Sequence, residues 1–172
     1  MTAIRAGALE GDRVISQAEI LADVAAWSTW MPFARAVDRA PRRPGVYLAR
    51  QGPDGALIYV GKAGERRGWG IRGRLALYSR GQAAASGLGE AAFDRALADR
   101  EWLLQRLAEV DAGTPRRVTA WAREAIRWAD IYLCWFATED EASAADLERR
   151  VLTLLHGHPL WNRRGAAEGR PA

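Results

Sequence analysis

The sequence has few of the residues on which several common kinds of site depend. It contains one cysteine, Cys134, and two histidines, His156 and His158. One cysteine excludes an internal disulfide and a cysteine-built zinc site, and it is typical of a reducing compartment. The two histidines lie near an expected helix end with no activated serine, which disfavours a histidine metal site and a serine or cysteine hydrolase. We therefore expect a cytoplasmic protein whose chemistry uses other side chains.

Long hydrophobic runs are also missing. No apolar stretch approaches the roughly 18 residues of a membrane span, and the N-terminus lacks a basic region followed by an apolar core. We therefore expect neither a membrane segment nor a secretory signal. The 172 residues, of which 49% are hydrophobic, suit one domain with elaborations and suffice for a buried core.

Lysine is almost absent, although the chain is basic. The formal net charge is +4, and Lys62 is the only lysine among 25 basic residues. Guanidinium groups bind phosphate oxygens through two parallel hydrogen bonds, so the arginine-rich composition favours a polyanionic partner over a membrane surface. An ammonium group, unlike a guanidinium, has an adjustable pKa, which makes Lys62 a candidate for chemistry, with chance composition as the alternative.

The spacing of apolar residues predicts alternating strands and helices. Two short apolar runs, 46–50 and 56–60, flank Gly-Pro-Asp-Gly at 52–55, so they are expected to form a hairpin that places Tyr47 and Tyr59 on one face. The segment 35–44 contains two prolines and is expected to be a linker. Further helices are expected at 16–30, 71–80, 90–110, 115–129 and 139–156, with a third strand at 131–138.

Five short elements occur in a definite order. They are Gly-Val-Tyr at 45–47, Tyr-Val-Gly-Lys-Ala at 59–63, Arg74-Leu75 with Tyr78 four residues later, Glu148 in a late helix, and Pro-Leu-Trp-Asn at 159–162. Each is a weak signal alone, but together they resemble the GIY-YIG nucleases, which include restriction enzymes, homing endonucleases and a domain of the bacterial excision-repair nuclease. The closing Pro-Leu-Trp-Asn looks most like the restriction-enzyme branch.

The resemblance implies an α/β (α+β) fold with a small central, mainly antiparallel three-stranded sheet flanked by helices. We divide the chain into an N-terminal helical arm and linker at 1–43, a nuclease domain at 44–165 and a C-terminal tail at 166–172. A helical insertion at about 81–129, with two expected helices, separates the helix of Arg74 from the third strand. Compact members of the superfamily lack such an insertion.

The resemblance and the needs of phosphodiester hydrolysis together assign a catalytic role to each motif residue. Tyr47 is expected to accept the proton of the attacking water, and Lys62 to lower the pKa of that phenol, because an ordinary phenol is a poor base at neutral pH. Arg74 is expected to hold the scissile phosphate, with Tyr59 and Tyr78 orienting water and phosphate. Packing within the strands is the alternative for the tyrosines.

Glu148 is the candidate metal ligand. A helical projection places it within the apolar arc of its helix, beside Leu147 and Val151. A buried carboxylate needs a guanidinium or a hard divalent cation as its partner. The resemblance favours Mg2+ or Mn2+, with waters and a substrate phosphate completing the coordination. Asn162 is placed in the same site, where its amide is expected to tie a buried backbone to the helix of Glu148 rather than to take part in chemistry.

Double-stranded DNA is the expected partner, and arginines are the candidates to contact its backbone. Arg66, Arg67 and Arg72 lie in a glycine-rich loop region. The helix at 115–129 offers a second group: it is expected to bury one face and to present a cationic face opposite, with a solvated arginine stripe as the alternative. The buried face is Val118, Trp121, Ala125 and Trp128, and the cationic face is Arg116, Arg123 and Arg127. The helix at 90–110 is expected to point Phe93, Leu97, Leu104 and Leu107 inward.

The sequence therefore predicts a divalent-metal-dependent DNA endonuclease, with a restriction-like enzyme preferred. A structure-specific repair nuclease and a catalytically silent DNA-binding module are the alternatives. Cleavage of a plain duplex would separate the restriction type from the repair type, and any metal-dependent nicking would exclude the silent module. A homodimer is a candidate assembly.

Overall fold

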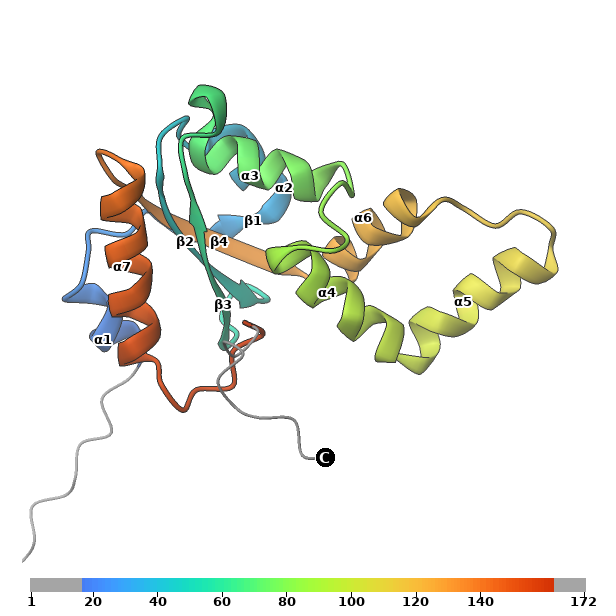
Figure 1. Ribbon diagram of the computed structural model, residues 1–172. Coiled ribbons are helices and arrows are strands. Elements are labelled where there is room, and N and C mark those ends of the chain that lie inside the picture. Colours follow the sequence, from blue (N-terminus) through green and yellow to red (C-terminus); the bar gives the residue numbers. More distant parts are fainter. Residues whose placement is uncertain (1–16, 163–172) are drawn as a thin grey trace, which may run out of the picture.

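The computed structural model describes residues 17–162, without the side chains of residues 17–19 and Arg66. Its centre is an antiparallel sheet in the order β1-β4-β2-β3 (Figure 1). The strands are β1 at Met31–Pro32, β2 at Gly45–Gln51, β3 at Leu57–Ala63 and β4 at Ile131–Ala137. β3 is therefore an edge strand of the sheet.

The sheet has four strands where three were expected. The additional strand, β1, has two residues, and it pairs Met31 with Leu133 and Pro32 with Tyr132 of β4. So short a strand carries no alternating pattern that a sequence could reveal, and its proline is tolerated because β1 is the other edge of the sheet. The broader expectation of a mixed fold with a central antiparallel sheet and flanking helices is confirmed.

The expected hairpin is present as β2 and β3. Their register pairs Tyr47 with Gly61 and Ala49 with Tyr59. Successive residues of a strand point to opposite faces, so Tyr47 and Tyr59 share one face, as predicted. β2 is longer than its expected range by one residue at each end, and β3 begins one residue later and ends three residues later than expected.

Helices cover both faces of the sheet. α7, at Glu141–Leu154, lies on one face together with α1 at Gln17–Ala22, while α2 at Phe33–Arg39 and α3 at Gly70–Ser79 lie on the other (Figure 1). A 3-10 turn at Arg66–Gly68 precedes α3. Two apolar cores result, one on each face. Among residues 17–162, no helix is long and apolar enough to cross a membrane.

Two expectations for the N-terminal region were wrong. The segment 35–44 is helical through Arg39 in α2, because the prolines break the helix only from Pro41 and Ala36 packs completely buried against the sheet. The first helix ends at Ala22 rather than at residue 30. Beyond it the chain follows β4, where the N–H of Ser28 donates to the carbonyl of Trp135.

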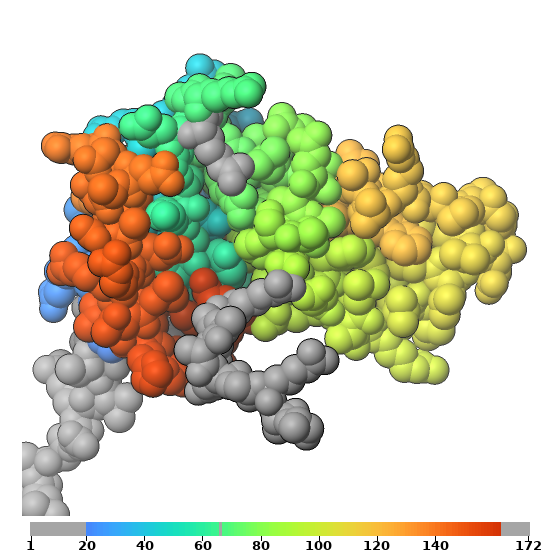
Figure 2. Space-filling model, in the orientation of Figure 1, coloured from blue at the N-terminus to red at the C-terminus, as the bar shows by residue number. Residues whose placement is uncertain are grey.

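The insertion contains three helices rather than two: α4 at Gly87–Ala98, α5 at Arg100–Asp111 and α6 at Val118–Trp128. Asp99 separates α4 from α5, and its side chain caps α5 by accepting from the N–H of Trp102 at 2.7 Å. In Figures 1 and 2 the insertion extends away from the sheet, with α5 farthest from it.

Several residues of the insertion differ in burial from what was expected for a single helix at 90–110. Trp102 and Arg106 are the buried residues of α5, whereas Leu97, Leu104 and Leu107, expected to point inward, are 39%, 45% and 50% exposed. Phe93 does pack with the buried Trp102. In α6, Val118 is 54% exposed, because the buried positions are Ala122, Ala125 and Ile126.

Candidate active site

Three tyrosines and one arginine from β2, β3 and α3 meet on the sheet face that α3 covers. The hydroxyl oxygens of Tyr47 and Tyr78 lie 2.7 Å apart, and Arg74 Nε donates to the Tyr78 oxygen at 2.8 Å. The rings of Tyr47 and Tyr59 stack with centroids 6.3 Å apart. Tyr47 and Tyr78 are 1% exposed, whereas Tyr59 and Arg74 are partly buried. We call these four residues the tyrosine cluster.

The hydrogen bonds of the tyrosine cluster hold Arg74 in place. The Tyr78 oxygen accepts from Arg74 Nε and, at 3.3 Å, from the backbone N–H of Leu88. A phenol oxygen has two lone pairs, so the Tyr78 hydroxyl hydrogen is left to donate to Tyr47. Tyr47 in turn holds the Tyr78 hydroxyl, and the charge of Arg74 lowers the pKa of Tyr47. Two buried phenols therefore fix the position of one guanidinium group.

Tyr47 and Tyr59 hold their protons more tightly than ordinary phenols. Burial raises the pKa of Tyr47 well above its usual value, Tyr78 and Tyr59 raise it further, and Arg74 opposes them. Burial is also the main cause of the raised pKa of Tyr59, followed by Tyr78. Both phenols therefore stay protonated to a higher pH than an ordinary phenol does. The environment of Tyr47 therefore disagrees with the expected role of a water-activating base.

Lys62 does not act on Tyr47 as expected. The register pairs Lys62 with Val46 and Gly61 with Tyr47, so Lys62 belongs to the sheet face that α7 covers. On that face its charge lowers the pKa of Glu148. The alternation of strand residues thus separates the lysine from the phenol whose pKa it was expected to lower.

Glu148 reaches the edge strand β3 from α7. Its carboxylate is partly buried and lies near enough to Lys62 for the charge and the backbone of that residue to act on it. Burial raises the pKa of Glu148, and the Lys62 ammonium opposes this shift. Burial and Tyr78 are the largest causes that raise the pKa of Tyr59, and Arg74 lowers it. The charge of Glu148 makes a smaller contribution that also raises it. Glu148 therefore lies within electrostatic reach of the tyrosine cluster, at the strand edge between the two faces.

Asn162 closes the outer edge of β3. The N–H of Val60 donates to Asn162 Oδ1 at 3.0 Å, and Asn162 Nδ2 donates to the Val60 carbonyl at 2.7 Å. The neighbouring N–H of Trp161 donates to the carbonyl of Ile58. An edge strand otherwise leaves backbone N–H and C=O groups without partners. Asn162 hydrogen-bonds to backbone, as expected, but it holds the C-terminal segment to β3 rather than to the helix of Glu148.

The Glu148 carboxylate suits a divalent cation. Because burial raises its pKa, a positive charge beside it would stabilise the ionised form. In the described part of the chain, no group of three His, Cys, Asp or Glu residues could hold a metal. Glu148 would thus be a single protein ligand, an arrangement in which Mg2+ or Mn2+ keeps several waters and takes a substrate phosphate. Such a cation would supply positive charge to the phosphate oxygens.

The first turn of α4 covers the tyrosine cluster, which the sequence pattern did not predict. Gly87 has a φ of +60°, and a Cβ there would lie 2.5 Å from Arg74 Nη2 and 2.6 Å from the Tyr78 hydroxyl. Only glycine allows this approach and this backbone conformation. The insertion therefore contributes Gly87 and the N–H of Leu88 to the site. Their signal in the sequence is the glycine-rich stretch 81–89.

A cavity of about 410 Å³ lies beside Tyr59, between α4 and the segment that follows α7. Its lining includes Glu90 and Asp94 as well as Trp161, over whose ring the Arg95 guanidinium lies at 4.5 Å. Figure 2 shows the surface of β3, in teal, between α7 in orange and α4 in green. The cavity adds carboxylate and aromatic groups next to the tyrosine cluster.

The first group of expected DNA-binding arginines has divided roles. Arg67 is exposed, and the side chain of Arg66 lies outside the described part of the structure. Arg72 donates to the carbonyls of Ala40 at 2.8 Å and Asp38 at 2.7 Å. Two donors of Arg72 are thus used at the C-terminal end of α2, which leaves Arg67 as the more available cation.

The second group is divided as well. Arg116 forms ion pairs with Glu109 and Glu124, which also pair with the buried Arg106. The hydrogen bond from Arg116 is the main cause that lowers the pKa of Glu109 to about 2. Arg116 therefore joins α5 to α6 rather than standing in a free cationic stripe. Arg123 and Arg127 are exposed, as predicted.

Comparison of the chain with models of protein families, with curated proteins and with solved structures found no match.

Proposed function

We propose that this protein is a divalent-metal-dependent endonuclease of GIY-YIG type that hydrolyses phosphodiester bonds in double-stranded DNA. The observation that carries the proposal is the meeting of Tyr47, Tyr59, Arg74 and Tyr78 on one side of β3, with Glu148 at its edge. Four of the five sequence motifs thus supply a fixed guanidinium group, neutral phenols and one carboxylate within a small region. These are parts that phosphodiester hydrolysis needs.

In this proposal Arg74 binds the scissile phosphate and Glu148 holds Mg2+ or Mn2+. Tyr59 is the phenol that orients the attacking water, because it is partly exposed and lines the cavity. Tyr47 and Tyr78, which are buried, position Arg74. We therefore assign Tyr47 the role of positioning Arg74, in place of the expected role as the base. Lys62 adjusts the charge of Glu148, and Asn162 holds the strand edge.

A catalytically silent DNA-binding module remains the alternative that one observation favours. The first turn of α4 lies against the Arg74 guanidinium, and a substrate phosphate has to reach the same group. If α4 blocks that approach in solution, DNA binds without cleavage. Metal-dependent nicking would exclude this module, and cleavage of branched DNA but not of plain duplex would indicate a repair nuclease.

We also propose a homodimer formed through α5. Six exposed residues of this helix fall within an arc of about 120° at 100° per residue. They are Arg100, Leu103, Leu104, Leu107, Val110 and Asp111. When two copies of α5 pair antiparallel with Leu104 opposite Leu107, Arg100 of each copy lies opposite Asp111 of the other. A two-fold symmetric dimer therefore buries the apolar stripe formed by the leucines and Val110 and pairs the charges at its two ends.

The function is tested by incubating the purified full chain with mixed linear and supercoiled DNA and Mg2+, followed by sequencing of the product ends. A restriction-like enzyme yields ends at a recurring sequence in plain duplex. Absence of any new ends in Mg2+ and in Mn2+ would contradict the proposal.

A further inference from the structure

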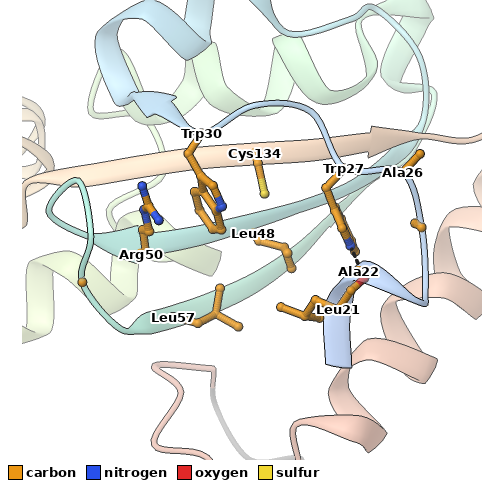
Figure 3. Close-up of a pocket in the computed structure, with 11 residues that line it drawn as sticks. Leu21, Ala22, Ala26, Trp27, Trp30, Leu48, Arg50, Leu57 and Cys134 are labelled. Carbon is orange, nitrogen blue, oxygen red and sulfur yellow. Dashed lines mark hydrogen bonds between the residues drawn. The ribbon is translucent and has the colours of Figure 1, made fainter. Parts of the chain in front are cut away.

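A second cavity, also of about 410 Å³, lies on the sheet face opposite the tyrosine cluster. α1 and the segment after it form one wall, and β2, β3 and β4 form the floor. Figure 3 shows Arg50 and Trp30 at one end, and Leu21, Ala22 and Ala26 at the other. The lining between them is apolar. It includes Trp27, Leu48, Leu57 and the thiol of Cys134.

The charged end of the cavity is incompletely satisfied. The Arg50 guanidinium carbon lies 4.5 Å from the centre of the Trp30 ring. Its Nε is buried and has no hydrogen-bond partner among the described residues. Buried donors in proteins nearly always have a partner, so this one calls for an acceptor. By contrast, the indole N–H at Trp27 is already used, since it donates to the Leu21 carbonyl at 2.8 Å.

The shape and the charge together select a class of ligand. Pockets for small molecules are mostly apolar, enclose some hundreds of Å³ and carry a few polar groups that fix orientation. A guanidinium group matches a carboxylate in geometry as well as charge. Cys134 is not a competing reactive group, because burial raises the pKa of its thiol to about 12 and keeps it protonated.

We propose that this cavity binds a medium-chain carboxylate, with its carboxylate against Arg50 and its hydrocarbon chain along Trp27, Leu48 and Leu57 towards α1. The acceptor oxygens satisfy the unpaired Arg50 donor, and the chain buries apolar surface that the cavity leaves open. The site is independent of the proposed nuclease activity, because Leu48 and Arg50 face away from the tyrosine cluster.

The test uses the wild-type full chain and three probes of equal chain length, below their micelle concentrations. These are octanoate, octan-1-ol and octyltrimethylammonium. Isothermal titration calorimetry is expected to show saturable binding, with octanoate about tenfold tighter than octanol, because a charge-assisted hydrogen bond contributes at least that much. Octyltrimethylammonium is expected to bind most weakly. This order requires no variant, so the proposal can be tested even if a substitution impairs folding.

Three variants locate the site. Arg50→Met keeps a long apolar side chain against Trp30 and is expected to remove the preference for octanoate over octanol. Ala25→Phe fills the cavity and is expected to weaken both ligands. Arg149→Met changes an arginine whose side chain is 72% exposed on α7 and is expected to change neither affinity.

Equal affinity of the wild type for octanoate and octanol, full octanoate affinity in Arg50→Met, or no saturable binding of octanoate would each overturn the proposal. The cavity would then be a surface for another occupant, such as residues 1–16 or a second copy of the chain.

Discussion

The charge of Lys62 on β3 lowers the pKa of the Glu148 carboxyl on α7, although the two residues are 86 positions apart in sequence. The larger effect of burial raises the same pKa, and the backbone of Lys62 adds a smaller lowering effect. One residue therefore acts on the candidate metal ligand in two ways. The backbone contribution survives substitution of the side chain, so the charge can be tested alone.

Lys62→Met is predicted to move the acidic limb of the pH–rate profile to higher pH. Glu148 must be ionised to hold a cation, and without the ammonium its pKa, already raised by burial, rises further. As the pH falls, the variant therefore loses activity at a higher pH than the wild type does, and it regains activity when the pH is raised. Rates of plasmid nicking from pH 5 to 9 measure the shift, with Lys62→Arg as the matched control that keeps the limb in place. A uniformly lower rate with an unmoved limb would instead make Lys62 a phosphate-binding residue.

Asn162→Asp is predicted to lower stability more than catalysis. The substitution keeps an acceptor for the Val60 N–H but loses the donor to the Val60 carbonyl, and it places a negative charge against that oxygen. We expect a loss of about 1–3 kcal/mol in the free energy of unfolding, measured by urea titration. Activity well below the melting temperature should stay within a few-fold of wild type. A fully stable but inactive variant would give Asn162 a catalytic role.

The paired variant Arg123→Ala/Arg127→Ala is predicted to flatten the slope of log affinity for DNA against log salt by about two units, because each phosphate contact releases roughly one counterion. Arg116→Ala is the informative comparison. Since Arg116 is paired with Glu109 and Glu124, it should leave the slope unchanged and lower the melting temperature instead. An unchanged slope in the paired variant would leave Arg67 as the next candidate.

Leu104→Glu is predicted to shift the protein from dimer to monomer in sedimentation velocity experiments, because it places two carboxylates in the apolar stripe of α5. Arg100→Asp should weaken the dimer through repulsion from Asp111. Adding Asp111→Arg to Arg100→Asp should restore the dimer, since the swapped charges again lie opposite each other. A wild type that is monomeric at all concentrations, or a double variant no better than the single one, would contradict the antiparallel arrangement.

Local patterns predicted the parts of the site that depend on near neighbours. The turn at 52–55 set the hairpin, and helical spacing brought Arg74 to Tyr78. Strand alternation also places Lys62 and Tyr59 on opposite faces of β3, because their positions differ by an odd number. The expected partnership with Tyr47 failed for this reason.

Other features depend on contacts that no local pattern contains. The charge that acts on Glu148 comes from Lys62 on a remote edge strand, and the cover over Arg74 comes from an insertion. In α5, apolar spacing alone favoured burial of Leu104 and Leu107. α5 begins after the Asp99 cap, and its buried residues are Trp102 and Arg106 instead, with Arg106 paired to Glu124 of α6. Tertiary packing decided which of two amphipathic faces was buried.

The most direct test of the proposed nuclease compares wild type with Glu148→Gln on supercoiled plasmid in Mg2+, with DNA affinity measured on the same preparations. Glu148→Gln removes the charge that would hold the cation and leaves the exposed arginines unchanged. We predict that the wild type nicks or linearises the plasmid, that chelation of Mg2+ stops it, and that the variant binds DNA equally well but cleaves at less than about a hundredth of the wild-type rate. Equal cleavage by wild type and variant, or no cleavage by the wild type with any divalent cation, would contradict the account.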